Sequence, residues 1–325
     1  MIEVRDLTKR FGNKVAVDHL SFSVQPGRVT GFLGPNGAGK STTMRLILGL
    51  DHPTGGSATI FGKPYARLAN PLRTVGAVLE AKSVHGGRSA RNHLLFLAQT
   101  QGLPARRVDE MLHLVGLGDV AGKRARSYSL GMSQRLGVAA ALLGDPQVLL
   151  LDEPVNGLDP EGVLWIRNLM KHLAGQGKTV LVSSHLMNEM SVTADHLVVI
   201  GRGRLLADAP TADVVARGSG QSVRVRTPDA DRLTALIIDA GGSVIPGSNG
   251  GPVGDPDDKT PVLTVTGLPA ARIGQLASSA AIELHELTPQ LATLEDAFLE
   301  LTSESLEFGH RNAGVPVQAT DGSAR

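Results

Sequence analysis

The sequence predicts an α/β fold with a largely parallel central sheet. Strand-like and helix-like runs alternate along the first part of the chain. Residues 148–151 and 179–182 are continuously apolar, as are strands that lie buried on both faces in a parallel sheet. A glycine-rich turn follows directly on the apolar run at residues 29–33 and leads into a helix-like segment. This alternation is typical of a sheet that carries helices on its faces.

Composition limits the classes of protein to which the chain can belong. With 325 residues, of which 42% are hydrophobic, the chain is long enough for about two domains with proper cores. A net charge of +1 gives no overall attraction to nucleic acid or to an anionic membrane surface, so we expect no nucleic-acid partner. The absence of cysteine excludes disulfides and thiolate metal sites and fits a reducing compartment.

No segment has the pattern of a signal peptide or a membrane span. The first residues are already charged, and no later window approaches the ~20 apolar residues that a transmembrane helix needs. We therefore expect a cytoplasmic protein, and any role at a membrane has to come through a partner.

The elements of the first domain follow from these patterns in order. Short strands are predicted at residues 2–4, 21–24, 29–33, 58–61 and 75–79, with a helix at 40–50 after the glycine-rich turn. From about residue 86 to 143 the apolar period becomes helical, which predicts a helical insertion. The strands at 148–151 and 179–182 then complete the core, and the second of them is expected to be its last strand.

A composition shift at residues 217–221 indicates a linker to a second, smaller α+β domain. Its expected elements form a βαββαβ module at residues 223–225, 233–238, 242–245, 262–265, 270–278 and 282–287. A polar loop is expected at 249–258 and a helix start at Thr293. The predicted boundaries are 1–217 for the first domain and 221–305 for the second, with a disordered tail at 309–325.

The most specific motif is a G-x-x-x-x-G-K-S loop at the end of the strand at residues 29–33. A strand, a glycine-rich turn and a helix start aim a row of backbone N–H groups at one point, and such a point binds polyphosphate. Lys40 is expected to reach the β- and γ-phosphates, and the Ser41 hydroxyl to ligate Mg²⁺. The alternative is an accidental glycine-rich turn, which the strand before it and the helix after it disfavour. The predicted nucleotide-binding residues are Gly34, Pro35, Asn36, Gly37, Ala38, Gly39, Lys40, Ser41 and Thr42.

Two carboxylates, Asp152 and Glu153, follow the apolar strand at residues 148–151. Ligands of open α/β sheets bind at the carboxyl ends of the strands, so we expect both carboxylates close to the phosphates. Asp152 is expected to hold Mg²⁺, and Glu153 is the candidate general base beside the water that attacks the γ-phosphate. The alternative is an exposed acidic pair that only ends a strand.

Between the phosphate loop and the acidic pair lies the sequence Tyr-Ser-Leu-Gly-Met-Ser-Gln-Arg at residues 128–135, followed by an apolar helix. This segment resembles the signature motif of ATP-binding cassette (ABC) proteins, in the form seen in bacterial drug- and antibiotic-export ATPases of the daunorubicin-resistance type. Ser129 and Gly131 match the family pattern, whereas Tyr128, Leu130 and Met132 depart from it. The resemblance implies that Ser129, Gly131 and the helix N-terminus cap the γ-phosphate of an ATP molecule held by a second subunit. The alternative is an ordinary helix cap.

Other residues match family positions one at a time. His185 resembles the histidine that hydrogen-bonds the γ-phosphate, and a structural histidine at a strand end is the alternative. Asp159, in the sequence Asn-Gly-Leu-Asp, resembles the end of the family's D-loop and can also cap the helix that Pro160 opens. Phe11 is similar in position to the aromatic residue that stacks on adenine, with a core phenylalanine as an equal alternative.

One position departs from the family in a way that concerns the mechanism. After the strand at residues 75–79 the family usually has a glutamine that contacts Mg²⁺, and this chain has Glu80. The resemblance therefore implies a metal-contacting role for Glu80, whose charge would bind the metal more strongly but repel the γ-phosphate. We expect Glu80 to alter the Mg²⁺ dependence or the rate of hydrolysis.

The resemblance covers about residues 1–215 and implies a P-loop NTPase core of the ABC type, with an antiparallel β subdomain and a helical insertion. It implies the ATPase subunit of an exporter of drugs, antibiotics or lipids, with ATP and Mg²⁺ as cofactors. The implied partners are a second copy or a paralogous cassette, and a separate membrane permease that sets the substrate and holds the subunit at the cytoplasmic face. Residues 81–91 are the expected contact with that permease. A soluble ABC ATPase that acts in regulation or translation is the alternative.

Overall fold

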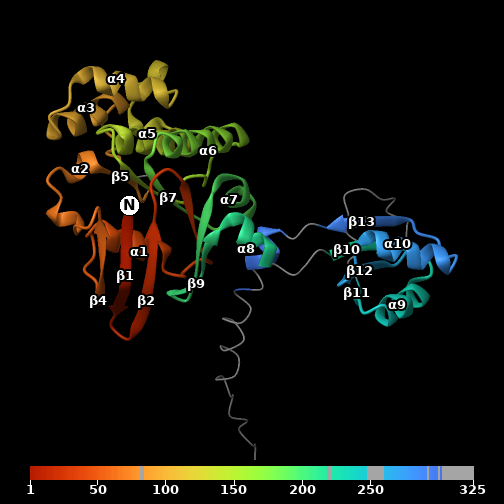
Figure 1. Ribbon diagram of the computed structural model, residues 1–325. Helices are drawn as coiled ribbons and strands as arrows, with labels where there is room; N and C mark the ends of the chain where they lie inside the picture. Colours follow the sequence, from red (N-terminus) through yellow and green to blue (C-terminus); the bar gives the residue numbers. More distant parts are fainter. Residues whose placement is uncertain (81–83, 218–221, 247–259, 291–292, 299–300, 302–325) are drawn as a thin grey trace, which may run out of the picture. The chain divides into compact units, whose positions relative to one another are not determined.

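The computed structural model describes residues 1–80, 84–217, 222–246, 260–290, 293–298 and 301. These residues form two compact units (Figure 1). The first contains the described residues within 1–211 and Leu301, and the second contains the described residues between 212 and 300. The polar loop and the tail expected at residues 249–258 and 309–325 lie outside the described residues. In the part of the chain that the structure describes, no helix combines the length and the apolar character needed to cross a membrane.

A six-stranded sheet forms the centre of the first unit. Its order is β5-β6-β7-β3-β8-β9, in which the first five strands run parallel and β9 pairs antiparallel with β8. The strands are β3 (Val29–Leu33), β5 (Val75–Val78), β6 (Val148–Asp152), β7 (Thr179–Ser184), β8 (His196–Gly201) and β9 (Arg204–Pro210). Because β6, β7 and β3 are neighbours, their carboxyl ends bring three separate sequence segments to one edge of the sheet.

The expectation that residues 179–182 form the last core strand is wrong. The strands β8 and β9 follow β7 in the chain and extend the sheet beyond β3, and α8 (Thr211–Arg217) comes after them. Every residue of β8 is buried. The strand begins with His196, whose Nε2 lies 2.6 Å from Oδ1 of Asp208 on β9, and continues with the apolar residues 197–200. This partner satisfies Nε2, whereas Nδ1 of His196 is buried without a hydrogen-bond partner among the described residues.

A separate antiparallel sheet, in the order β2-β1-β4, confirms the predicted β subdomain. It consists of β1 (Ile2–Phe11), β2 (Lys14–Val24) and β4 (Gly55–Ile60). The strands β1 and β2 are much longer than the sequence indicated, because their outer parts alternate between buried and exposed residues and carry bulges that break the apolar pattern.

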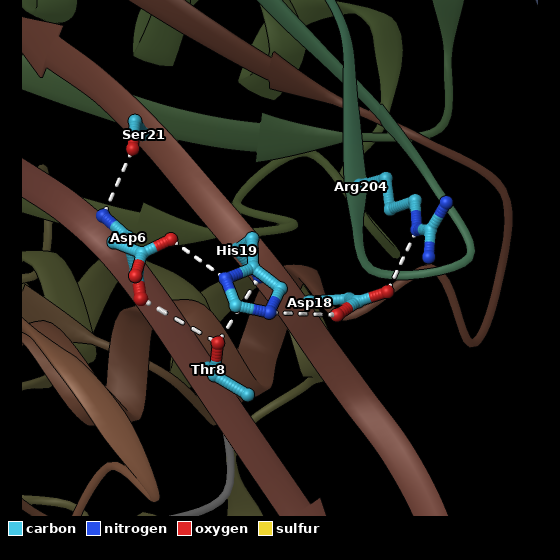
Figure 2. A network of polar contacts seen from close by, with 6 residues as sticks. All are labelled: Asp6, Thr8, Asp18, His19, Ser21 and Arg204. Carbon is cyan, nitrogen blue, oxygen red and sulfur yellow. Dashed lines mark hydrogen bonds and ion pairs between the residues drawn. The ribbon is translucent and has the colours of Figure 1, made fainter.

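A polar network on this small sheet joins it to the turn between β8 and β9 (Figure 2). Arg204 Nε donates to Asp18 Oδ2 at 2.7 Å, and His19 Nδ1 lies 2.7 Å from Asp6 Oδ1. The backbone N–H of Asp18 donates to the Gly203 carbonyl, and the Gly203 N–H donates to the Ala38 carbonyl, each at 2.9 Å. Ala38 lies in the phosphate loop, so the β8–β9 turn is hydrogen-bonded directly to that loop.

The helices of the first unit are α1 (Lys40–Ile47), α2 (Pro71–Thr74), α3 (Ala90–Thr100), α4 (Ala105–Leu114), α5 (Leu130–Leu142), α6 (Pro160–Gly175) and α7 (Met187–Thr193). Short 3₁₀ turns lie at Tyr65–Arg67, Gly118–Val120 and Ala125–Ser127. The helix α1 ends before the predicted residue 50. The helices α3 to α5 form the predicted insertion, which packs around the fully buried Leu94, Val108 and Leu136 (Figure 1).

The second unit has the predicted βαββαβ order. Its elements are β10 (Ser222–Arg226), α9 (Ala230–Asp239), β11 (Ser243–Pro246), β12 (Val262–Thr266), α10 (Ala270–Ser279) and β13 (Glu286–Gln290). The strands form an antiparallel sheet in the order β11-β12-β10-β13, which is a ferredoxin-like arrangement. Val225, Val265, Leu233 and Ile273 fill the core between the sheet and both helices.

The last strand of this unit was predicted too early, at residues 282–287. Ile282 is buried against the core from the segment that precedes β13, so its apolar character reflects packing outside a strand. The helix start at Thr293 is confirmed, because Thr293 Oγ1 accepts from the Asp296 N–H at 3.2 Å and Asp296 Oδ2 accepts from the Thr293 N–H at 3.1 Å. Residues 294–298 are helical.

Candidate nucleotide-binding site

The phosphate loop between β3 and α1 borders a cavity of about 400 Å³ at the carboxyl edge of the large sheet. Gly39 immediately precedes α1 with φ of 109°, and a Cβ there would lie 2.5 Å from the Ala16 carbonyl oxygen. Only glycine therefore fits this turn. The cavity is lined by Phe11, Lys14, Ala16, Pro35, Asn36, Gly37, Gly39, Lys40, Ser41, Thr42 and Glu153.

Lys40 is held with its ammonium group at the loop. Its side chain is only 6% exposed, and Nζ donates to the Gly34 carbonyl at 2.6 Å. Nζ also lies 3.5 Å from Glu153 Oε1. The ammonium group is available to a polyanion that enters the cavity, because phosphate oxygens carry full negative charge and attract it more strongly than the neutral carbonyl of Gly34 does.

Glu153 and His185 meet in the structure although 31 residues separate them in the sequence. Glu153 Oε2 lies 2.8 Å from His185 Nδ1, so the structure joins Lys40, Glu153 and His185 into one chain of contacts. Glu153 has a left-handed backbone, with φ of 48°. Its N–H is held by Ser183, through the carbonyl oxygen at 3.3 Å and the hydroxyl at 3.0 Å. These bonds fix the carboxylate directly after β6.

Asp152 lies at the end of β6 and accepts a short hydrogen bond from the Ser183 hydroxyl. Ser41, which lines the cavity, is exposed. Carboxylate and hydroxyl oxygens are the donors that Mg²⁺ prefers, and this ion commonly takes few protein ligands and completes its shell with phosphates and water. Within the described ranges no group of three or more His, Cys, Asp or Glu side chains could hold a metal by itself. Ser41 and Asp152 carry oxygen donors of the kind that suits Mg²⁺.

Phe11 lies at the end of β1 and borders the phosphate cavity. Its side chain is 51% exposed, with Lys9 Nζ 4.8 Å from the ring centroid. A core position is thereby excluded, because a core phenylalanine would be buried. An exposed ring at the rim of the cavity is available for stacking on a planar base.

The predicted signature residues border a second cavity, of about 300 Å³. Ser129 precedes α5, and its Oγ accepts from the Met132 N–H at 3.2 Å. Asp159 precedes α6, and its Oδ1 accepts from the Gly162 N–H at 2.9 Å, as predicted for a cap. Both helix starts open on the same cavity, which is lined by Ser129, Leu130, Gly131, Met132, Arg135, Gly157, Leu158 and Asp159. It shares no lining residue with the phosphate cavity.

Glu80 lines a third cavity, of about 500 Å³, and not the phosphate cavity. Arg45, on α1, lines the same cavity and bonds Asp51 through Nε at 2.7 Å. The hydrogen bond to Asp51, with the charges of Asp51 and Glu80, raises the pKa of the Arg45 guanidinium. Glu80, for which we predicted a metal contact, is therefore not among the residues that line the phosphate cavity.

Known proteins resemble the chain over most of its length. A family model described as ABC transporter matches residues 17–156. The bacitracin transport ATP-binding protein of Bacillus licheniformis is 42% identical over 240 residues, which cover 73% of this chain and 78% of that protein. The chain belongs to the ABC transporter ATP-binding family. It is an ATP-hydrolysing, nucleotide-binding subunit, and its relatives include proteins named for the transport of bacitracin and of lantibiotics, so the soluble alternative is not favoured.

Two other relatives extend the likeness. An uncharacterized ABC transporter ATP-binding protein of Bacillus subtilis is 33% identical over 311 residues, which cover 94% of this chain and 97% of that protein. A solved structure of an ATP-binding subunit of an ABC transporter has a TM-score of 0.61 at 28% identity and covers 66% of this chain and 91% of that one. The second unit matches a family model for a domain of unknown function, at residues 221–295.

The family match does not assign roles to individual residues, so those roles have to be inferred from the geometry of the site. The structure brings together the phosphate loop, Glu153 and His185, and it brings Ser129 and Gly131 together with Asp159. Sequence reasoning missed Ser183, which bonds both Asp152 and the Glu153 backbone. Its position directly after the strand predicted at residues 179–182, two residues before His185, was the available signal, since ligands of a parallel sheet bind at the carboxyl ends of its strands.

Proposed function

We propose that two copies of the chain, or one copy and a paralogous cassette, close on two Mg·ATP molecules and hydrolyse them. The supporting observation is that each chain carries two separate half-sites, one around Lys40 and one around Ser129, which share no lining residue. Ser129 is exposed and not buried in its own fold. A γ-phosphate held at Lys40 of one subunit would meet Ser129 and Gly131 of the other. A solved cassette with the same fold at 24% identity is described as a dimer bound to ADP and phosphate.

The proposed roles follow from the positions of the side chains. Lys40 and the loop N–H groups neutralise the β- and γ-phosphates, and Phe11 stacks on the base. Ser41 and Asp152 would hold Mg²⁺, which when bound supplies further neutralisation of phosphate charge. Glu153 orients the attacking water and accepts its proton. His185 stays within hydrogen-bond distance of Glu153 and can donate to the γ-phosphate through its other ring nitrogen.

We further propose that the third cavity receives a separate membrane subunit. It lies between α1, β5 and the helical insertion, and its lining includes Leu50 and Leu72, which are 56% and 52% exposed. Exposed leucines around a hollow are typical of a protein contact. Of the segment expected at residues 81–91, residues 84–91 are described and lead into α3. Since relatives are named for transport of bacitracin and of lantibiotics, we propose that the partner exports an antibiotic or a similar compound.

Co-purification tests this assignment. The tagged chain is expected to recover an integral membrane protein from detergent-solubilised membranes. The change Leu50→Glu with Leu72→Glu should reduce that recovery at least about tenfold, because a carboxylate buried against an apolar contact costs more than about 1.4 kcal/mol. Ile238→Glu, at a residue 58% exposed in the second unit, is the matched control. Recovery of soluble factors alone would favour a regulatory ATPase.

The role of Glu80 is tested by Glu80→Gln. If Glu80 contacts the metal, half-saturation of ATPase activity should require about fivefold more Mg²⁺, because removing one full charge beside a divalent cation costs about 1 kcal/mol in a wet site. The measurement is a Mg²⁺ titration at fixed ATP, with Glu161→Gln on the exposed start of α6 as the control. An unchanged kcat together with an unchanged titration would show that Glu80 serves only the third cavity.

A further inference from the structure

Leu130, the first residue of α5, contacts the segment that links Glu153 to α6. A Cβ placed on Gly157 would lie 2.1 Å from Leu130 Cδ2 and 2.7 Å from Leu130 Cγ, so the leucine side chain covers this glycine directly. Gly157 has φ of 74°, a second reason for glycine at this position. The Leu130 side chain is nevertheless 45% exposed, so it does not simply fill a core.

The covered segment is a short succession of turns that begins at the candidate base. The Asn156 N–H donates to the Glu153 carbonyl at 3.2 Å, and the Leu158 N–H donates to the Val155 carbonyl at 3.1 Å. Asp159 then caps α6. Two backbone hydrogen bonds therefore connect the few residues between Glu153 and Leu158.

The other side of the contact is the signature turn. Ser129 precedes Leu130, and a Cβ on the following residue, Gly131, would lie 3.4 Å from Leu158 Cδ2. Arg135, one helical turn further along α5, lies 4.8 Å from the Trp165 ring centroid on α6. The start of α5 therefore packs against the Gly157 segment, and Arg135 packs against α6.

We propose that Leu130 is a positioning residue that couples the two ATP sites through one chain. The inference rests on the proposed sandwich, in which Ser129 faces the ATP of the partner and Glu153 faces the ATP of its own subunit. When Ser129 engages a γ-phosphate, Leu130 presses on Gly157 and sets the carboxylate of Glu153. Each chain therefore hydrolyses its own ATP fastest when it also caps the ATP of the other.

Leu130→Ala tests the coupling. We expect kcat to fall about tenfold and the ATP dependence to approach that of independent sites, with KM for ATP unchanged, because misplacing a reacting group by a fraction of an ångström costs rate and not binding. Leu130→Met should restore most of kcat. Leu164→Ala, at a leucine on α6 that is 50% exposed and lines none of the cavities described above, is the matched control.

A double-mutant cycle separates coupling from a general loss of stability. Gly157→Ala alone should lower kcat, because its methyl group meets the leucine. In the Leu130→Ala background the clash with Cδ2 and Cγ is gone, and the Cβ of residue 130 lies 3.5 Å from the added methyl group. The backbone strain of alanine at φ of 74° remains in both backgrounds, so the added loss should be smaller than in wild type but not zero. Additive losses, or wild-type kcat and cooperativity in Leu130→Ala, would overturn the inference alone. Absence of an ATP-dependent dimer in Glu153→Gln would overturn the sandwich, and the coupling with it.

Discussion

Glu153→Gln is expected to bind ATP, to lose at least about 99% of its ATPase activity and to accumulate as an ATP-bound dimer. The amide keeps the size of the side chain but cannot accept a proton from water, and general-base catalysis contributes about 100-fold or more. Binding should survive because Lys40 keeps its bond to the Gly34 carbonyl and the phosphate loop is unaltered. Phosphate release measures hydrolysis, and light scattering on a sizing column with and without Mg·ATP measures the dimer.

The controls for this variant separate the base from the fold. Glu161→Gln removes a carboxylate from the exposed start of α6 and should leave both readouts unchanged. His185→Ala, which removes the neighbour of Glu153 at 2.8 Å, should retain ATP binding and lose only part of the rate. A Glu153→Gln protein that stays monomeric at saturating Mg·ATP would contradict the proposed sandwich.

Lys40→Ala should abolish useful nucleotide binding, with the Kd for ATP raised at least about thirtyfold. Hydrogen bonds to charged groups contribute about 2 kcal/mol or more. Among the described residues that line the cavity, Lys14 is the other lysine, and it is exposed whereas Lys40 is buried beside the loop. Titration calorimetry with ATP in the presence of EDTA measures this loss without hydrolysis.

Lys171→Ala, on the exposed face of α6, is the matched control for charge. Thermal unfolding of Lys40→Ala must also be compared with wild type, because Lys40 Nζ holds the Gly34 carbonyl in the absence of nucleotide. An ATP affinity equal to that of wild type in a folded Lys40→Ala protein would refute the assignment of this loop.

The sequence predicted the parts of the fold whose patterns are local. Residues 148–151 and 179–182 are apolar throughout because both faces of β6 and β7 are covered, and the G-x-x-x-x-G-K-S turn fixes its own strand and helix. The long strands β1 and β2 were underestimated, because exposed residues interrupt their apolar pattern and register shifts between β1 and β2 disturb the alternation. β8 and β9 were missed, since no chemical motif marked them.

The predicted site residues likewise fall into two groups: those positioned by contacts within their own loop and those positioned by contacts with distant segments of the chain. Lys40 and Asp159 are set by their own loops, so sequence sufficed to place them. The pairing of Glu153 with His185 depends on the order of β6, β7 and β3, which alternation alone does not specify. The position of Glu80 beside Arg45, and the contact of Leu130 with Gly157, arise from the packing of the insertion and have no sequence pattern of their own.

The left-handed backbone of Glu153 has a consequence for the evolution and engineering of this chain. A non-glycine residue in that conformation costs about 1 kcal/mol or more, and asparagine or glycine would relieve the cost. Selection for thermal stability alone would therefore favour replacement of the glutamate at this position. A glutamate here is consistent with a folded state that is less stable than it could be, in exchange for the position of the proposed catalytic carboxylate.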